Sequence, residues 1–200
     1  MDEPDEPLIR ANFGFVWGQK GALELYALRD LIGEENMDTA LRAFKDSFAY
    51  RTAGPYAGAP DLYATLKAHT PDSLQYFIED SWLKRRFYDN KMDSFTVVPT
   101  GRPDEYKVTL HVTVAKTWIE PDGREVPATA FADYIDIGIT GDAPKDSTVA
   151  GLKLPFLQKF KLSAGPHVIT EIVHGKPHMA GIDPLGLLID RHPGANVRFF

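Results

Sequence analysis

The spacing of apolar residues changes once along this 200-residue chain, near Asn90. Before this point apolar residues recur three and four positions apart, which is the spacing of one helix face. After it they alternate with polar residues, and turn sequences rich in Gly, Pro and Asp separate the alternating runs. Strands with no helices between them favour antiparallel pairing. The pattern therefore predicts an α+β fold, with an N-terminal helical subdomain over residues 1–90 and an antiparallel β-sandwich over residues 91–200.

Four helices are expected in the first part. The first covers 21–32, with Gly33 as its stop. The second carries the strongest amphipathic stripe of the chain, formed by Met37, Ala40, Leu41, Phe44 and Phe48. The third covers 61–68. The fourth follows Thr70, whose hydroxyl suits an N-cap, and we expect it to finish on Lys84-Arg85-Arg86, where cations complement the helix dipole.

Strands are expected where apolar and polar residues alternate. In the clearest case Val108, Leu110 and Val112 point to one face, and the residues between them point to the other. The expected strands are 95–98, 106–114, 135–139, 156–162, 166–173 and 187–190. We expect the aromatic residues of the helical part, Trp17, Phe44 and Trp82 among them, to pack the helices against the sandwich.

Composition excludes several classes of function. With 28 acidic and 22 basic residues the net charge is −6, whereas a nucleic-acid binder needs a basic face. The absence of Cys excludes disulfides and thiolate metal sites and leaves the compartment open. No apolar run approaches the ~20 residues of a membrane helix. The first seven residues are acidic and contain two prolines, unlike a signal peptide. We therefore expect a soluble chain without a nucleic-acid partner.

The histidines do not form a recognisable metal motif. None of the six is followed by Glu, so His-Glu-x-x-His is absent. His174 and His178 are four residues apart, but the turn sequence Gly175-Lys176-Pro177 separates them, and no Cys or carboxylate cluster accompanies them. We expect no metal site in this chain.

Two carboxylates near the end of the chain are also candidates for a site. Asp183 and Asp190 lie seven residues apart, and paired carboxylates can perform acid–base chemistry. A structural interpretation is favoured, in which Asp183-Pro184 forms a turn and Arg191 makes an ion pair.

Three stretches of the chain resemble a known enzyme family. They are Gln19-Lys20-Gly21-Ala22-Leu23, Thr70-Pro71-Asp72-Ser73-Leu74-Gln75-Tyr76, and Ala180-Gly181-Ile182-Asp183-Pro184 through Leu188-Ile189-Asp190-Arg191. They look like the carboxy-terminal part of bacterial zinc aminopeptidases of the aminopeptidase N type, within the gluzincins, including versions fused to permease segments of ABC transporters. The resemblance extends over nearly the whole chain. It departs at Gly58-Ala59, where the family has a Thr-Ser cap, and at Leu83–Phe87, where a more acidic and apolar stretch is expected.

The resemblance implies where a substrate would lie. Family members carry Tyr-x-Lys-Gly at the helix that follows the zinc site, and the tyrosine hydroxyl stabilises the oxyanion. Aligning Lys20-Gly21 with that Lys-Gly places Gly18 at the tyrosine position, with Trp17 beside it. Gly18 cannot donate a hydrogen bond as a phenol does, so we assign no catalytic residue to this chain. The substrate-cleft candidates are Trp17, Gly18, Lys20 and Gly21.

Two hypotheses follow for the function. In the first, the chain is a fragment of a zinc aminopeptidase and is inactive alone. The zinc ligands and the general base then lie upstream, this chain holds no cofactor, and its partner is the upstream catalytic half. In the second, it is a non-catalytic module that binds peptides or proteins and is attached to a membrane transporter. A His-Glu-x-x-His motif before Met1 would support the first hypothesis, whereas Gly18 favours the second.

Overall fold

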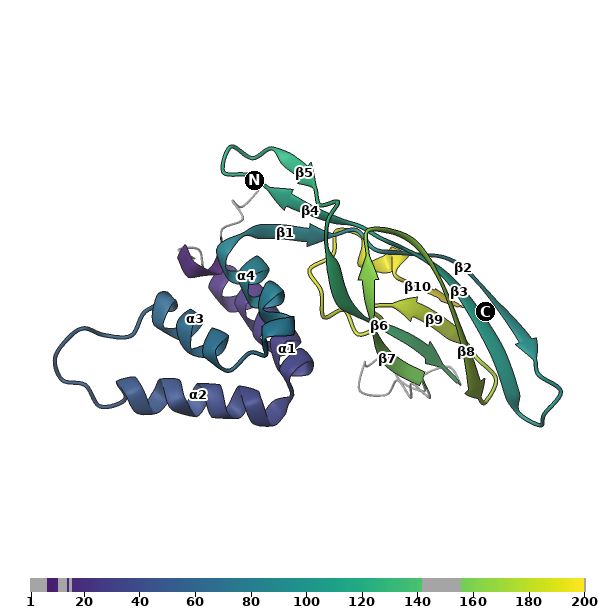
Figure 1. Ribbon diagram of the computed structural model, residues 1–200, viewed down its shortest axis with the longest axis horizontal. Coiled ribbons are helices and arrows are strands. Elements are labelled where there is room, and N and C mark those ends of the chain that lie inside the picture. The colour runs from purple at the N-terminus through teal and green to yellow at the C-terminus, as the bar shows by residue number, and fades with distance from the viewer. Residues whose placement is uncertain (1–6, 11–13, 15, 142–155, 200) are drawn as a thin grey trace. The chain divides into compact units, whose positions relative to one another are not determined.

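The computed structural model describes residues 7–10, 14, 16–141 and 156–199. The fold combines helices with three antiparallel sheets, so the prediction of a mixed α+β protein is confirmed (Figure 1). The chain separates into two compact units. One comprises Met1–Arg86 together with Trp118–Arg124, and the other comprises Phe87–Thr117 together with Glu125–Phe200.

The first unit contains the four α-helices of the described residues. Their bounds are α1 Gly21–Ile32, α2 Glu34–Phe48, α3 Ala59–Ala68 and α4 Gln75–Leu83. A 3₁₀ turn at Leu8–Arg10 and a π-helical segment at Val16–Lys20 precede α1, and a second 3₁₀ turn at Asp72–Leu74 precedes α4. All four predicted helices are therefore present.

The start of the fourth helix differs from its prediction. The Thr70 hydroxyl donates its hydrogen bond back to the carbonyl of Leu66 at 2.8 Å, so it does not cap the helix that follows. The chain passes first through the turn at Asp72–Leu74, and α4 begins only at Gln75. Thr70 is buried beside the end of α3, and there the nearby carbonyl of α3 is its partner.

The end of the fourth helix was also predicted wrongly. α4 stops at Leu83 because Lys84 has extended backbone angles, and Arg85 and Arg86 belong to strand β1 (Arg85–Tyr88). Lys84 still forms an ion pair with Asp80 of α4 at 2.9 Å, but these cationic side chains also make tertiary contacts. The Lys84 ammonium lies 4.5 Å from the centre of the Trp118 ring, and Arg86 pairs with Glu24 of α1 at 3.0 Å, both side chains being 2% exposed.

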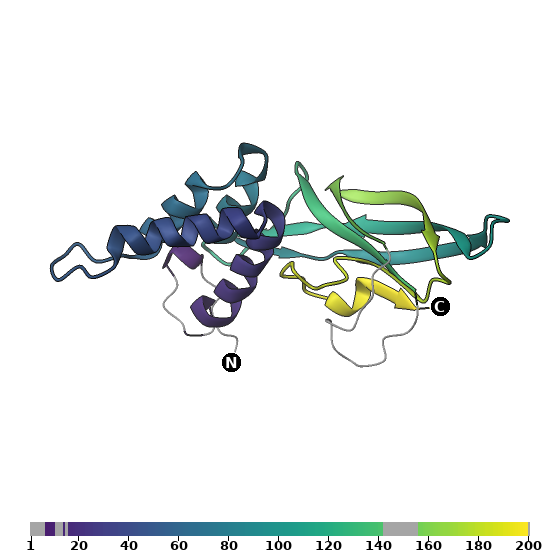
Figure 2. The same ribbon diagram turned by 90° about the horizontal axis from the view of Figure 1, so that it is seen from below.

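Ten strands are described. Their bounds are β1 Arg85–Tyr88, β2 Lys91–Pro99, β3 Glu105–Val114, β4 Lys116–Ile119, β5 Glu125–Pro127, β6 Ala132–Thr140, β7 Phe156–Ser163, β8 Gly165–His174, β9 Met179–Ile182 and β10 Val197–Phe199. They form sheets of order β1-β4-β5, β2-β3-β8 and β10-β9-β6-β7. In Figure 2 the long strands β2 and β3 run side by side, in agreement with their antiparallel register from Lys91–Thr113 to Pro99–Tyr106.

The sheets β2-β3-β8 and β10-β9-β6-β7 share one hydrophobic core. On β3 the predicted alternation is confirmed, because Val108, Leu110 and Val112 are fully buried while Lys107 and His111 are exposed. Strands β6, β7 and β9 of the other sheet contribute further side chains to this core, among them Ile135, Ile137, Ile139, Leu162, Ala180 and Ile182.

The strand predicted at 187–190 does not form. The Asp183 carboxylate accepts hydrogen bonds from the amides of Leu187 and Leu188, which holds this stretch in a turn. Only Asp190 makes a bridge there, a parallel one to Tyr88. Five short strands, β1, β4, β5, β9 and β10, were not predicted, because three or four residues are too few to show an alternating pattern.

Candidate functional site

The segment that precedes α1 is anchored at both ends and exposed in the middle. It is a π-helix over Val16–Lys20, in which Val16 is fully buried and Lys20 is 8% exposed, whereas the Trp17 side chain is 65% exposed. Short π-helical segments are rare and often occur at functional sites. An exposed indole beside two buried anchors is therefore the first feature of a candidate site.

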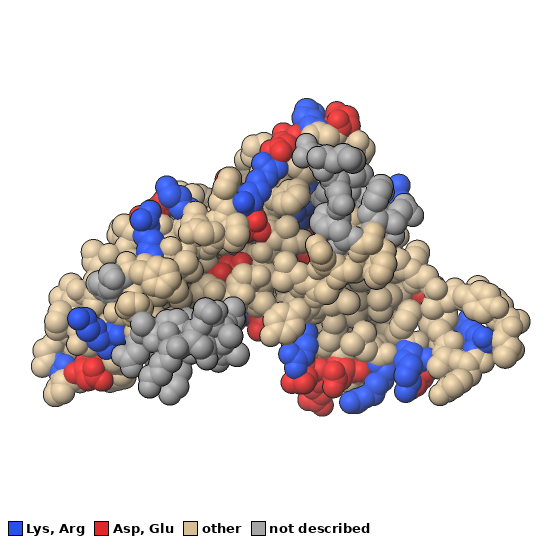
Figure 3. Space-filling view, turned by 180° about the vertical axis from the view of Figure 1, so that it is seen from behind, with Lys and Arg blue, Asp and Glu red and all other residues tan. Residues whose placement is uncertain are grey.

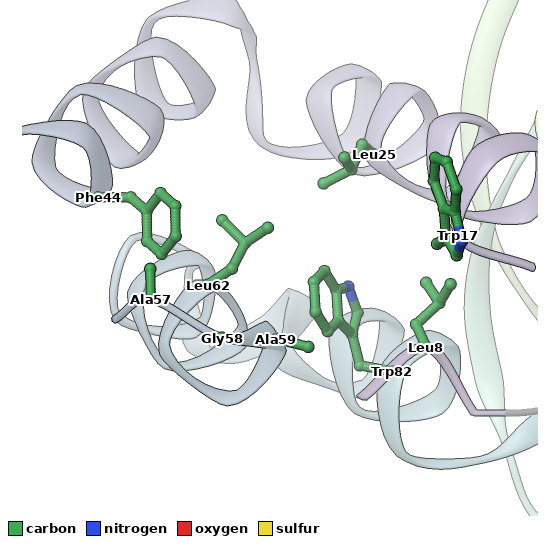
Figure 4. A pocket seen from close by; sticks show the side chains of 10 residues that line it. Leu8, Trp17, Leu25, Phe44, Ala57, Gly58, Ala59, Leu62 and Trp82 are labelled. Atoms are coloured by element: carbon green, nitrogen blue, oxygen red, sulfur yellow. The ribbon is translucent and has the colours of Figure 1, made fainter. Parts of the chain in front are cut away.

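Trp17 belongs to an open apolar cavity of about 320 Å³ within the first unit. We call it the apolar cavity. Its lining is contributed by Leu8, Trp17, Gly21, Leu25, Phe44, Ala57, Gly58, Ala59, Leu62 and Trp82. Figure 4 shows the rings of Phe44 and Trp17 toward opposite ends of the opening in this view, with Trp82 between them. None of the lining side chains is ionisable, and the two indole N–H groups are the only side-chain hydrogen-bond donors.

Helical spacing places these side chains together. Gly21 and Leu25 are four residues apart and therefore share one face of α1. Phe44 comes from α2, Leu62 from α3 and Trp82 from α4. Each of the four helices thus contributes to the lining.

The amphipathic stripe of α2 is covered at one end only. Met37 and Ala40 are buried, but Leu41 is 40% exposed, and Phe44 and Phe48 remain partly exposed. The stripe was predicted from its spacing, whereas its incomplete covering depends on the neighbouring helices. The open part of the cavity at Phe44 follows from this incomplete packing.

The structure brings together only part of the predicted substrate cleft. Trp17 and Gly21 line the apolar cavity, whereas Gly18 and Lys20 do not. Gly18 is half-buried, and a Cβ atom added to it would meet nothing within 4 Å. Lys20 is buried. The Cβ atom of a substituted residue at position 18 therefore has room.

Sequence reasoning missed most of the cavity lining. Phe44 and Trp82 were expected to pack the helices against the sandwich, and the sequence did not indicate that both line the cavity of the helical unit. Trp82 is 5% exposed, and its ring lies 6.1 Å from that of Tyr63. Burial of large apolar residues is the usual outcome in helices, so the sequence carried no signal that these particular side chains border an open space.

The histidine pair does not form a metal cluster in the structure. His174 lies at the end of β8 with its Nε2 4.0 Å from Glu105, and the ring of His178 lies 5.9 Å from that of Phe199. Over the described part of the chain, no three His, Asp or Glu side chains gather as a metal-binding group.

The structural interpretation of the acidic tail is confirmed. Asp183 has a φ of 46° and accepts hydrogen bonds from the amides of Leu187 at 2.9 Å and Leu188 at 3.0 Å. Arg191 forms a two-bond ion pair with Glu125, at 2.7 and 2.5 Å, and this pairing lowers the pKa of Glu125. These side chains therefore hold the tail in place.

Burial acts in the opposite direction on Asp183. Its side chain is almost fully buried, and this loss of solvent raises its pKa to about 7 against the two backbone hydrogen bonds, which lower it. The nearby charges of Asp136 and Asp190 add to the increase.

On the face seen in Figure 3, basic and acidic side chains are intermingled rather than separated by sign. The described helices include none that combines the length and the apolar character needed to cross a bilayer.

Comparison with known proteins adds no identity to these observations. No protein-family model and no curated protein matches this chain.

Proposed function

We propose that this chain is the carboxy-terminal part of an aminopeptidase N-like zinc metallopeptidase and is not catalytic by itself. Its helical unit forms one wall of the peptide cleft, and the β-sheets that follow form the β-sandwich of that family. The metal and the general base that the resemblance implies belong to upstream residues. When bound, the zinc would polarise the scissile carbonyl and activate water.

The apolar cavity is the observation that carries this proposal. The Gln19-Lys20-Gly21 sequence, which belongs to one of the three stretches that carry the resemblance, leads directly into α1. The residues on either side of Gly18 and Lys20 in that segment, Trp17 and Gly21, both line an open cavity. The segment expected to border a substrate therefore adjoins space in which a ligand group can lie.

The arrangement of strands supports the second part of the proposal. The sheets β2-β3-β8 and β10-β9-β6-β7 contribute to one core, and all of their residue-by-residue pairings are antiparallel. Two antiparallel sheets around a shared core are the architecture of a β-sandwich.

Gly18 lowers the rate of amide hydrolysis that we expect of the longer protein. A glycine at the family tyrosine position removes one donor to the developing oxyanion, and losing such a donor costs on the order of a hundred- to a thousandfold in rate. We expect slow or absent hydrolysis of amino-acid amides even when an upstream zinc-bearing half is present.

The test uses a fluorogenic amino-acid amide and the chain both alone and joined to its natural upstream sequence. The chain alone should bind no tight zinc and show no turnover. In the longer protein, Gly18→Tyr should raise kcat more than it changes KM, because the added contact forms in the transition state. Gly18→Phe, which lacks the hydroxyl, is the matched control. One tight zinc per isolated chain, or brisk turnover with Gly18 in place, would overturn the proposal.

A second candidate is a non-catalytic peptide- or protein-binding module, and Gly18 favours it. An apolar cavity binds a side chain without any catalytic group, so its walls suit this function equally well. Upstream sequence without His-Glu-x-x-His, together with peptide binding by the chain, would select this candidate.

A further inference from the structure

The size of the apolar cavity limits what it can hold. At about 320 Å³ it has roughly twice the volume of the ~150 Å³ engineered cavity that binds benzene. It also lies at the lower end of the range for ligand pockets, roughly 300–1,000 Å³. One bulky side chain fits this space, whereas a large cofactor does not.

The chemistry of the lining limits the ligand further. A charged group that entered the cavity would lose water and find no opposite charge among the ten lining residues, which is a costly transfer. Leu25, Phe44 and Leu62 offer only apolar contacts. The lining is therefore complementary to an uncharged group.

Trp17 and Trp82 add specificity for shape. Aromatic rings prefer offset or edge-to-face contact with another ring, and a buried indole N–H normally seeks an acceptor. Trp17 is 65% exposed, whereas the second indole of the lining, that of Trp82, is 5% exposed. An aromatic ligand group can therefore gain a new contact with Trp17 without displacing Trp82 from its packing against Tyr63.

We propose that the apolar cavity binds one uncharged aromatic side chain of a peptide, with Trp17 as its main contact. This inference rests on the proposed function in taking the ligand to be a peptide, and it names the class of side chain that the cavity selects. It requires neither zinc nor catalysis.

Two of the three tryptophans in the chain line the cavity, so their fluorescence can report binding. In a Trp118→Phe background only Trp17 and Trp82 emit. The probes are N-acetyl-phenylalaninamide and N-acetyl-lysinamide, which share a backbone and differ in the side chain. We expect the phenylalanine probe to shift the emission with an affinity at least about tenfold above that of the lysine probe.

Matched variants locate the site. Trp17→Ala should weaken binding of the phenylalanine probe at least about tenfold, as expected for an aromatic contact of this kind, and Trp82 remains as the reporter. Tyr26→Ala is the control, since Tyr26 is an exposed aromatic residue of α1 that does not line the cavity. It should change the affinity less than about twofold. Because Trp17 and Tyr26 are exposed, both variants should keep the parent melting temperature.

Several results would overturn the inference. Equal binding of the two probes would remove the selectivity, and an unchanged affinity in Trp17→Ala would place the site elsewhere. A dimer in sedimentation whose emission ignores both probes would show that a second copy covers the cavity. Selective binding by a chain whose longer protein lacks the zinc motif would leave this inference intact and reject the aminopeptidase proposal alone.

Discussion

The buried carboxyl group of Asp183 should make the stability of this protein decrease as the pH rises. Its pKa is raised to about 7 in the folded chain from the 3.8 of a solvent-exposed aspartate, because burial disfavours the charged form. Between these two values the unfolded chain has already released the proton while the folded chain still holds it. The contribution is therefore fully present below about pH 4 and is lost as the pH rises through about 7.

The size of the effect follows from the difference between the two pKa values. Each unit corresponds to about 1.4 kcal/mol, so this single group should reduce the free energy of unfolding by roughly 4 kcal/mol between pH 4 and pH 8. Other carboxylates act in the opposite direction, since hydrogen bonds lower the pKa of Asp93 and Glu105. The total pH profile therefore does not isolate Asp183.

Comparison with Asp183→Asn isolates it. The amide does not titrate, and it keeps one acceptor for the two backbone N–H groups but places an NH₂ against the other. We expect a pH-independent loss of about 1–3 kcal/mol from this unmatched donor, together with the disappearance of the Asp183 pH term. Denaturant unfolding of both proteins from pH 4 to pH 8 measures the difference. If the gap between the two proteins stays constant over this range, the carboxyl group does not titrate as argued.

Glycine and ion-pair substitutions give three further predictions for denaturant unfolding. Gly181→Ala should lower the free energy of unfolding by about 1–3 kcal/mol, because its Cβ would lie 2.7 Å from Val197 and 2.8 Å from a backbone oxygen. An unchanged denaturation midpoint would show that β10 shifts to make room for the added methyl group. Gly18→Ala, at a position where the space is open, should instead raise the free energy of unfolding by about 0.5–1 kcal/mol. Arg86→Met should lower the free energy of unfolding by about 3–5 kcal/mol, because it removes the guanidinium that pairs with the buried Glu24 carboxylate at 3.0 Å, and adding Glu24→Gln should recover part of this loss. No recovery in the double variant would contradict the assumed pairing.

Most helices and the long strands of this fold could be predicted because their signals are local. In β3 the alternation of Val108, Leu110 and Val112 indicated which face would be buried, and all three are fully buried. The α2 stripe likewise gave the correct helix. A periodic pattern indicates which side chains must be buried, and for β3 the second sheet packs over them.

Local signals failed where a partner lies far away along the chain. Arg85 and Arg86 read as cations at a helix end, yet Arg86 pairs with Glu24, which is 62 residues earlier. A buried guanidinium needs a carboxylate more strongly than a helix end needs a cation. The strand expected at 187–190 failed for a related reason, since the Asp183 side chain takes the amide hydrogen bonds that a strand would use.

The candidate site also combines features that local sequence patterns predict with features that depend on tertiary packing. The sequence alone determined that four helices form and which of their faces are apolar. Only the tertiary structure decided that Trp17, Phe44 and Trp82 border an open cavity, because an apolar stripe looks the same whether its neighbours cover it or leave it exposed. Packing between helices depends on how closely their backbones approach, and no local pattern of residues specifies that distance.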